Sequence, residues 1–138
     1  MALGIGVLAS NALAGGWGAA AWLRGRPSVA FWPLLRLAQA LVAAEVVLGF
    51  VLLARGGRAP DALHVTYGVA PLVITLISEG LRVGAAQREL EGVGDIESLD
   101  RSEQVAIARR VALDEMGVMT VGLLLIVTLA LRAYQTGG

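Results

Sequence analysis

Four uninterrupted apolar runs dominate this chain, near residues 3–23, 34–54, 62–83 and 112–133. Each run has about the 20 residues that a helix needs to cross the hydrocarbon core of a bilayer. The period-two alternation that marks the strands of a membrane barrel is absent, and Leu, Ala, Val and Gly dominate. The sequence therefore predicts an all-α fold, in which residues 1–138 form a single membrane domain with a bundle of four transmembrane helices.

The composition favours lipid over water as the solvent of this chain. Of its 138 residues, 57% are hydrophobic and 16% are charged, whereas soluble domains have about 25% charged residues. Eleven basic residues balance eleven acidic ones, without the basic excess expected of a protein that binds nucleic acid. Because the chain has no cysteine, the sequence excludes disulfides, thiolate metal sites and thiol catalysis.

The distribution of arginine predicts the orientation of the four helices. No positive charge precedes the first run, and Arg24 and Arg26 follow it, which favours an N-terminus outside and a first loop inside. In this orientation most arginines lie on the cytoplasmic side, namely Arg24, Arg26, Arg36, Arg82, Arg88, Arg101, Arg109 and Arg110, and only Arg55, Arg58 and Arg132 lie outside. We therefore expect a multi-pass protein of the plasma (inner) membrane with both termini extracytoplasmic.

The stretch 84–111 is the one long polar segment, and it is expected to extend the third and fourth helices as a cytoplasmic helical hairpin. The glycines of 92–94 predict the end of the first arm. The tetrapeptide 100–103, Asp-Arg-Ser-Glu, has the form of a capping box that begins the second arm. Acidic side chains, among them Asp95 and Glu97, gather in the turn, which is either a solvated surface or a docking site for a partner.

Polar residues inside the apolar runs are the first candidates for a functional site, because ionisable groups are costly at bilayer depth. One face of the third run is polar along its whole length and carries His64, Tyr67, Pro71, Thr75, Ser78 and Arg82, with Gly68 and Glu79 at its edge. These residues fall on one face of a helix at helical periodicity, so we expect that face to point into the bundle. The hydroxyls of Thr75 and Ser78 are also explained by hydrogen bonds to the local backbone.

Two further polar residues lie near the middle of the first and second runs, Asn11 and Glu45. They are at depths where a hydrogen bond between their helices can form, and such a clamp contributes about 1 kcal/mol. Alternatively, Glu45 carries protons or binds a cationic ligand.

A cluster of ion pairs is expected where the second, third and fourth runs approach the hairpin. Its members are Arg36, Glu79, Arg82, Asp114 and Glu115, with Gln39 at a similar depth. The cluster either locks the helix ends together or binds an anionic headgroup. Removal of one partner is expected to leave another charge without compensation.

Small residues at helical spacing predict close contacts between helices. They are Gly4, Asn11, Gly15 and Gly18 on the first run, Gly80 and Gly84 on the third, and Gly117 with Val121 on the fourth. The contacts form either within one chain or between chains. Besides membrane lipid, we therefore expect a protein partner or a homo-oligomer that uses these small-residue faces.

Two stretches carry a resemblance to known proteins. They are Leu37-Ala38-Gln39-Ala40 leading to Val47-Leu48-Gly49-Phe50, and then Leu63-His64 with Tyr67-Gly68. Together they resemble a group of small, uncharacterised four-span bacterial membrane proteins with the same leucine-histidine and tyrosine-glycine signature. More distantly, they are similar to one four-helix half of haem A synthase. That resemblance implies two axial histidines in each half.

His64 is the only histidine in the chain, so a bis-histidine haem cannot form within one subunit. A second copy of the chain or Met119 would have to supply the other ligand. We therefore expect no cofactor and no enzymatic activity, and interpret the chain as an accessory, structural or assembly subunit of a membrane complex. The alternative is a small haem- or quinone-binding redox protein whose cofactor contacts His64, Tyr67 and Glu45. Translocation of protons or a solute through Glu45 is a third hypothesis.

Overall fold

The computed structural model describes residues 2–58 and 62–136. Four long helices and one short 3-10 helix make up the fold. In chain order they are α1 (Ala2–Leu23), α2 (Phe31–Ala54), α3 (Ala62–Leu90), η1 (Ile96–Ser98) and α4 (Arg101–Thr136). The described residues contain no strand, and the prediction of an all-helical bundle is confirmed.

The helix boundaries follow from local sequence signals. The second helix begins at Phe31 instead of residue 34, because Pro33 falls in its first turn, where a backbone N–H is not needed. Glycines with positive φ follow the ends of α1 and α2: Gly25 has φ 61° and Gly56 has φ 87°. A glycine at these positions adopts the left-handed conformation at no steric cost and lets the chain leave the helix.

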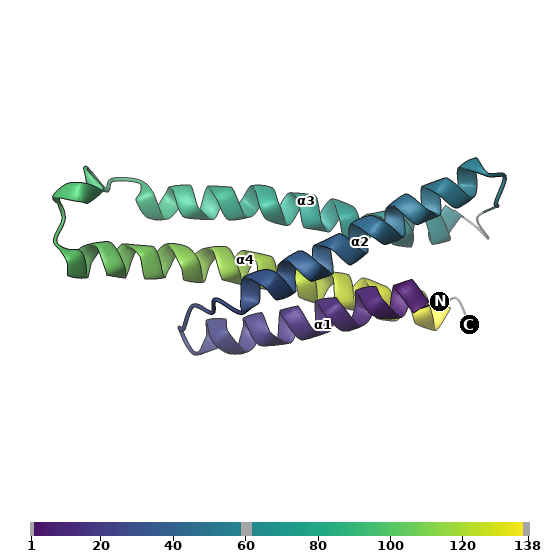
Figure 1. The fold of residues 1–138 in the computed structure, drawn as a ribbon, viewed down its shortest axis with the longest axis horizontal. Coiled ribbons are helices and arrows are strands. Elements are labelled where there is room, and N and C mark those ends of the chain that lie inside the picture. Colours follow the sequence, from purple (N-terminus) through teal and green to yellow (C-terminus); the bar gives the residue numbers. More distant parts are fainter. Residues whose placement is uncertain (1, 59–61, 137–138) are drawn as a thin grey trace.

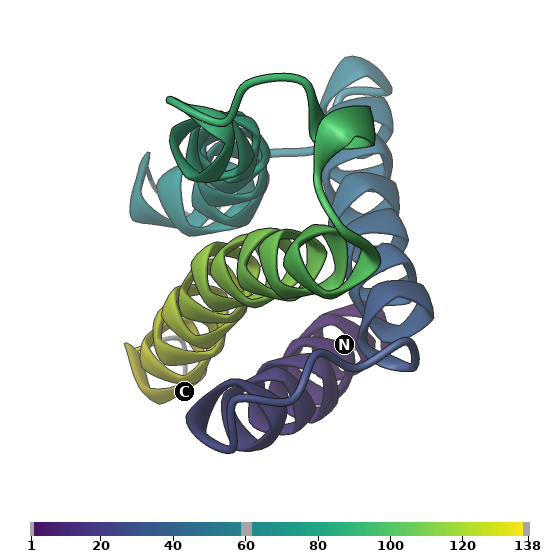
Figure 2. The same ribbon diagram turned by 90° about the vertical axis from the view of Figure 1, so that its left-hand side faces the viewer.

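The longest helix, α4, is the centre of the arrangement (Figures 1 and 2). Helices α1 and α3 pack along it, and both contacts are more extensive than the contact between α2 and α3. Helix α2 crosses the bundle obliquely, from α1 towards α3 (Figure 1). The beginning of α1 and the end of α4 lie at one end of the bundle, and η1 lies at the other, which we call the hairpin end.

The hairpin end consists of α3, η1 and α4 alone, because α1 and α2 are joined by a loop further along the bundle (Figure 1). This loop is held to its neighbours by two hydrogen bonds. The indole Nε1 of Trp17 donates to Ser28 Oγ at 2.8 Å, and Arg109 Nη2 of α4 donates to the carbonyl of Gly25 at 2.6 Å. The predicted hairpin over 84–111 therefore exists as an extension of the two longest helices.

The buried core lies where α1, α2 and α4 meet. Its main cluster contains Ala14, Phe31, Leu35, Ala38, Met116, Met119 and Leu123, and a smaller one contains Val7, Val42 and Ile126. The small residues of α1 permit this packing. A Cβ at Gly18 would meet Thr120 Oγ1 and come within 2.6 Å of Phe31 Cε2, and one at Gly15 would come within 3.0 Å of Leu124. The expected close contacts are therefore present between α1 and α4.

Gly80 and Gly84 of α3, unlike the two tightly packed glycines of α1, do not lie at a close contact between helices. A Cβ at Gly80 would meet no atom within 4 Å, and one at Gly84 would meet only Arg88 Nη1, at 3.9 Å. These two glycines pack against no other helix within the described chain. The small residues that bring α3 and α4 together are instead on α4, where Gly122 faces Ser78.

Large apolar side chains cover much of the outer surface. The second half of α2 is an extreme case, because all its residues from Val47 to Ala54 are exposed, including Phe50 and Leu52. In water, continuous apolar surface of this size would be a liability, whereas in a bilayer it faces acyl chains. Four helices are long and apolar enough to cross a membrane: Leu3–Leu23, Phe31–Ala54, Val65–Leu90 and Arg101–Gln135.

Candidate functional site

A cluster of charged residues joins α2, α3 and α4, and Glu79 of α3 is at its centre. Its Oε1 accepts hydrogen bonds from Arg36 Nη1 at 2.6 Å and from Gln39 Nε2 at 2.8 Å, both on α2. Its Oε2 accepts one from Arg82 Nε at 2.9 Å. Arg82 Nη1 also donates to Glu115 Oε1 of α4 at 3.0 Å. We call Arg36, Gln39, Glu79, Arg82 and Glu115 the polar cluster.

Helical spacing produces this geometry. Arg36 and Gln39 are three residues apart, as are Glu79 and Arg82, so each pair lies on one face of its helix. The Arg82 guanidinium also lies over the ring of Trp32, 5.9 Å from its centroid, and Trp32 packs edge-on against the buried Phe31. The side chains of Glu79, Arg82 and Glu115 are only 20% to 27% exposed. Through Arg82 and Trp32, the polar cluster is thus in contact with the buried core of the bundle.

Asp114 was expected in this cluster, and the structure places it elsewhere. Its carboxylate makes no ion pair with any of the described residues, and it lines a groove between α3 and α4 instead. The physical reason is the turn of about 100° between neighbouring residues of a helix. Glu115 faces Arg82, and Asp114 is therefore turned away from it.

The polar face of α3 points into the bundle over much of its length. Pro71 and Ser78 are buried, and Thr75, Glu79 and Arg82 are half-buried, whereas Leu76 and Ile77 on the other side are exposed. Thr75 Oγ1 donates to the carbonyl of Pro71 at 2.8 Å, so this hydroxyl satisfies its own backbone as the simpler interpretation predicts. The Ser78 hydroxyl does not bond to its local backbone in this way, and it has no hydrogen-bond partner among the described residues.

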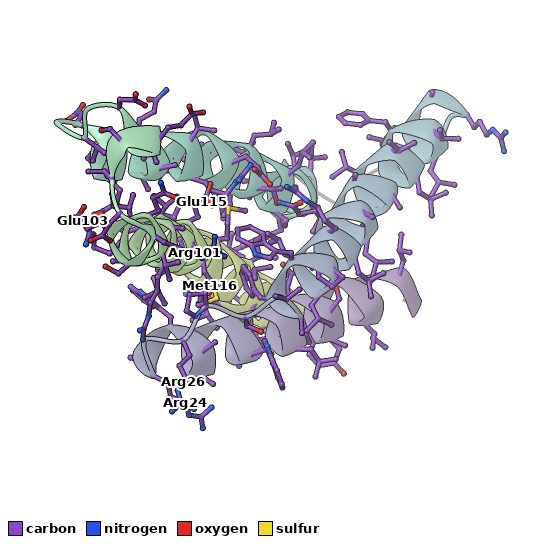
Figure 3. All side chains as sticks on the ribbon, turned by 60° about the vertical axis from the view of Figure 1, so that its left-hand side comes forward. Arg24, Arg26, Arg101, Glu103, Glu115 and Met116 are labelled. Carbon is purple, nitrogen blue, oxygen red and sulfur yellow. The ribbon has the colours of Figure 1, made fainter. Side chains whose placement is uncertain are left out.

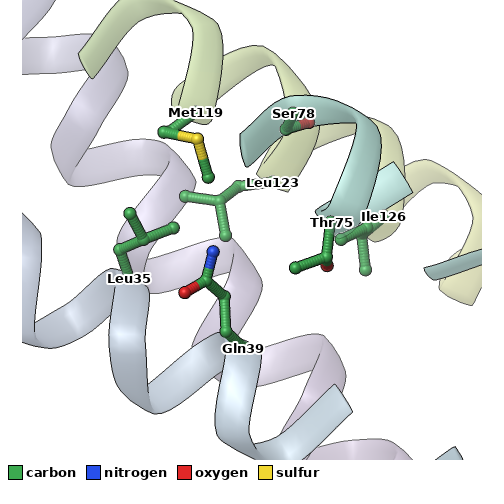
Figure 4. A pocket seen from close by; sticks show the side chains of 8 residues that line it. Leu35, Gln39, Thr75, Ser78, Met119, Leu123 and Ile126 are labelled. Atoms are coloured by element: carbon green, nitrogen blue, oxygen red, sulfur yellow. The ribbon is translucent and has the colours of Figure 1, made fainter. Parts of the chain in front are cut away.

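A narrow crevice lies inside the bundle beside the polar cluster (Figure 4). Gln39 projects into it from α2, Thr75 and Ser78 border it from α3, and Met119 and Leu123 close it from α4. Its volume is about 10 Å³, which is room for about one water molecule. Organic ligands occupy pockets of roughly 300–1,000 Å³, so this crevice does not accommodate a haem or a quinone.

The three candidate cofactor residues are not brought into a common site by the contacts of the described chain. Glu45 lies on α2 beside α1, with its Oε1 3.3 Å from the position of a Cβ at Gly4. Tyr67 is half-buried on α3 and forms no hydrogen bond with a described residue, so it is not bonded to Glu45. The backbone of His64 belongs to α3, and its side chain lies outside the described part.

Two other expectations for the interior have a definite outcome. Asn11 Nδ2 donates to the carbonyl of Val7 at 2.8 Å, and the buried Oδ1 has no partner, so the described contacts do not include the expected bond to Glu45. Met119, which was considered as a second haem ligand, is 2% exposed and packs in the main core cluster. Its position is explained by packing.

The hairpin is fixed by its own hydrogen bonds. Asp100 Oδ1 accepts from the backbone N–H of Glu103 at 3.0 Å, and Glu103 Oε2 accepts from the N–H of Asp100 at 3.3 Å, which confirms the capping box. The hydroxyl of Ser102 and the N–H of Glu103 lower the pKa of the Asp100 carboxyl. Gln104 Nε2 donates to the carbonyls of Ile96 and Leu99, at 3.0 and 3.1 Å.

An ion pair closes the base of the hairpin. Arg110 Nε of α4 lies 3.1 Å from Glu89 Oε2 of α3. Beyond it, Leu90, Ile96 and Val105 are exposed by 39%, 41% and 59%. In Figure 3, Glu103 lies at the tip, and Arg24 and Arg26 extend outward from the loop between α1 and α2. The acidic residues of the hairpin are evident from the sequence, whereas these apolar ones stand out only once the segment is known to lie beyond α1 and α2.

The fold is that of a multi-pass membrane protein, with four candidate membrane-spanning helices. Among the described residues, no group of three or more histidine, cysteine or acidic side chains is arranged to hold a metal ion. Comparison with known protein families, with curated proteins and with solved structures finds no match to this chain.

Proposed function

We propose that this chain is an integral plasma-membrane protein without enzymatic activity, and that it serves as an accessory or assembly subunit of a membrane complex. The observation that carries the proposal is the hairpin of α3, η1 and α4. It stands clear of α1 and α2, is held rigid, and exposes apolar side chains in the most polar part of the chain. A rigid exposed element of this kind is suited to docking a protein partner.

Rigidity follows from the contacts at both ends of the hairpin. The pair of Arg110 and Glu89 joins its two helices at the base, and the bonds from Gln104 tie η1 to α4 at the tip. Arg109 additionally ties α4 to the loop between α1 and α2. A partner that binds such an element loses little conformational entropy, because the element is ordered before binding.

The surface chemistry of the hairpin defines the partner. Between Glu91 and Glu103 the chain has five acidic residues and one basic residue, Arg101. The exposed Ile96 and Val105 lie within or next to this acidic segment. We propose a partner whose docking surface combines an apolar patch with basic residues. The arginine distribution supports a cytoplasmic location of the hairpin, with both termini on the opposite side.

Photo-crosslinking in intact cells tests the docking role. A photoreactive residue at Ile96 is expected to crosslink one discrete partner. The substitution Val105→Gln is expected to reduce that crosslink at least fivefold, because it removes an apolar contact. Ala106→Gln is the matched control, since Ala106 is exposed on the same helix one residue further on. An equal reduction by both substitutions, or no crosslink at Ile96, would contradict the proposal.

A visible spectrum tests the absence of a redox role. Purified protein is expected to be colourless and to give a flat reduced-minus-oxidised spectrum. A Soret band that is lost in His64→Ala would contradict the proposal and favour the resemblance to haem A synthase.

A further inference from the structure

A groove between α3 and α4 is a feature of the described surface that the proposed docking role does not use. Its volume is about 480 Å³, within the range of pockets that bind small organic ligands. Its walls are largely apolar and include Ile74, Ile77, Leu81, Val118, Val121 and Leu125, and Trp22 of α1 borders it as well. Gly117 and Gly122 also border it, and there the Trp22 ring and the Ser78 side chain pack directly against the backbone of α4.

The chemistry of the groove is not apolar throughout. Ser78 borders it, and its side chain is buried, with only 6% of the residue exposed. The Ser78 hydroxyl has no hydrogen-bond partner among the residues that the structure describes. A ligand that offers a carbonyl oxygen at this point would accept the hydroxyl hydrogen of Ser78.

Two opposite charges lie at the end of the groove nearest the hairpin, Arg88 on α3 and Asp114 on α4. Neither forms an ion pair within the described chain, and they do not pair with each other. The Arg88 side chain folds back along α3, since its Nη1 lies 3.9 Å from the position of a Cβ at Gly84. An anion and a cation carried by one ligand would complement both residues.

The length of the groove matches one leaflet. From Ile74 to Gly84, where the Arg88 guanidinium lies, α3 rises about 15 Å. That rise is about half the thickness of the hydrocarbon core of a bilayer. The charged end then lies at the depth of the headgroups, and Ser78 lies about 9 Å deeper along α3.

We propose that this groove binds one glycerophospholipid whose headgroup carries both a phosphate and a primary ammonium group. The phosphate binds Arg88, the ammonium donates to the carboxylate of Asp114, and an ester carbonyl accepts the hydroxyl hydrogen of Ser78. An acyl chain lies along the apolar walls. This site requires that α3 and α4 cross a membrane, but it does not depend on the docking role of the hairpin.

Native mass spectrometry of the delipidated full-length protein tests the site. The probes are phosphatidylethanolamine, phosphatidylglycerol and phosphatidylcholine with identical acyl chains, each titrated separately. Wild-type protein is expected to bind one phosphatidylethanolamine more tightly than either other lipid. Asp114→Asn is expected to lower this preference about threefold, the scale of a partly exposed ion pair. Arg88→Gln weakens all three lipids, and Ser78→Ala weakens all three without changing the preference.

Matched controls separate the groove from general charge effects. Arg101→Gln and Glu97→Gln change exposed charges of the hairpin and are expected to leave lipid binding unchanged. Val121→Phe fills the groove from an exposed position and is expected to abolish binding, with thermal unfolding as the check that it folds. Three results would overturn the proposal. The first is equal affinity for the three lipids, and the second is lipid binding by the groove variants that equals that of the controls. The third is a dimer that excludes lipid and is lost in Val121→Phe. A crosslink at Ile96 that persists beside any of these results would leave the docking role intact.

Discussion

Neutralising Glu79 should weaken the bundle more than neutralising any acidic residue of the hairpin tip. In Glu79→Gln the side chain keeps its length but loses the charge that three donors share: Arg36 at 2.6 Å, Gln39 at 2.8 Å and Arg82 at 2.9 Å. Arg82 retains Glu115, whereas the structure gives Arg36 no other acidic partner in the described chain.

The size of the effect follows from exposure. A hydrogen bond to a charged group contributes about 1.5–3 kcal/mol when buried, and an exposed ion pair contributes about 0–1 kcal/mol. Arg36 is 56% exposed and Arg82 is 23% exposed, so the bond from Arg82 accounts for most of the loss. Glutamine replaces part of it through its carbonyl oxygen. We expect a decrease of about 2 kcal/mol in the free energy of unfolding.

Unfolding in mixed micelles with increasing dodecyl sulfate, followed by tryptophan fluorescence, measures this decrease. Glu91→Gln is the matched control, because Glu91 is exposed and makes no ion pair with the rest of the described chain. A double-mutant cycle between Arg36→Gln and Glu79→Gln should give a coupling of about 0.5–1 kcal/mol. If Glu79→Gln unfolds at the same point as Glu91→Gln, the polar cluster does not hold α2, α3 and α4 together.

Two further predictions concern packing and the hairpin. Gly18→Ala should lower the free energy of unfolding by about 1–3 kcal/mol, because the new Cβ would lie 2.6 Å from the buried Phe31. Gly16→Ala on the same helix is the control: its Cβ meets nothing within 4 Å, so this substitution should be neutral or stabilising. Equal stabilities of the two variants would refute the close packing of α1. Ser102→Ala removes the largest cause of the lowered Asp100 pKa, so the midpoint in a carbon-13 titration should move up. A carboxyl whose pKa is lowered in the folded protein stabilises the fold at pH values above its pKa in the unfolded chain, and this stabilisation is lost as the pH falls. The cap of α4 should therefore be lost at a higher pH in Ser102→Ala than in the wild-type protein. An unchanged midpoint would contradict this reasoning.

The elements of this fold were predictable because their signals are local. Lipid requires long apolar segments with satisfied backbones, so each apolar run marks a helix, and α3 and α4 continue beyond their runs into the hairpin. The capping box of Asp100 and Glu103 is local in the same way, since both residues belong to one turn. Most of the polar cluster also follows from the sequence, because depth along each helix limits which charges can meet.

What the sequence could not supply is the relative rotation and crossing of the helices. Asp114 and Glu115 have the same depth, and only the rotation of α4 decides that Glu115 faces Arg82. The oblique path of α2 leaves its second half exposed and places Glu45 beside Gly4, two turns from Asn11. The groove bordered by Ser78, Arg88 and Asp114 exists only because Gly122 lets α4 approach α3, a contact between residues far apart in the chain.

The central claim is that four helices cross the membrane and present the hairpin to the cytoplasm. Single-cysteine labelling in intact cells tests it most directly, because the chain has no cysteine of its own. With a membrane-impermeant maleimide, Glu97→Cys in the hairpin should react only after the membrane is opened, and Arg58→Cys beyond α2 should react in intact cells. Labelling of Glu97→Cys in intact cells, together with protection of Arg58→Cys, would contradict the account.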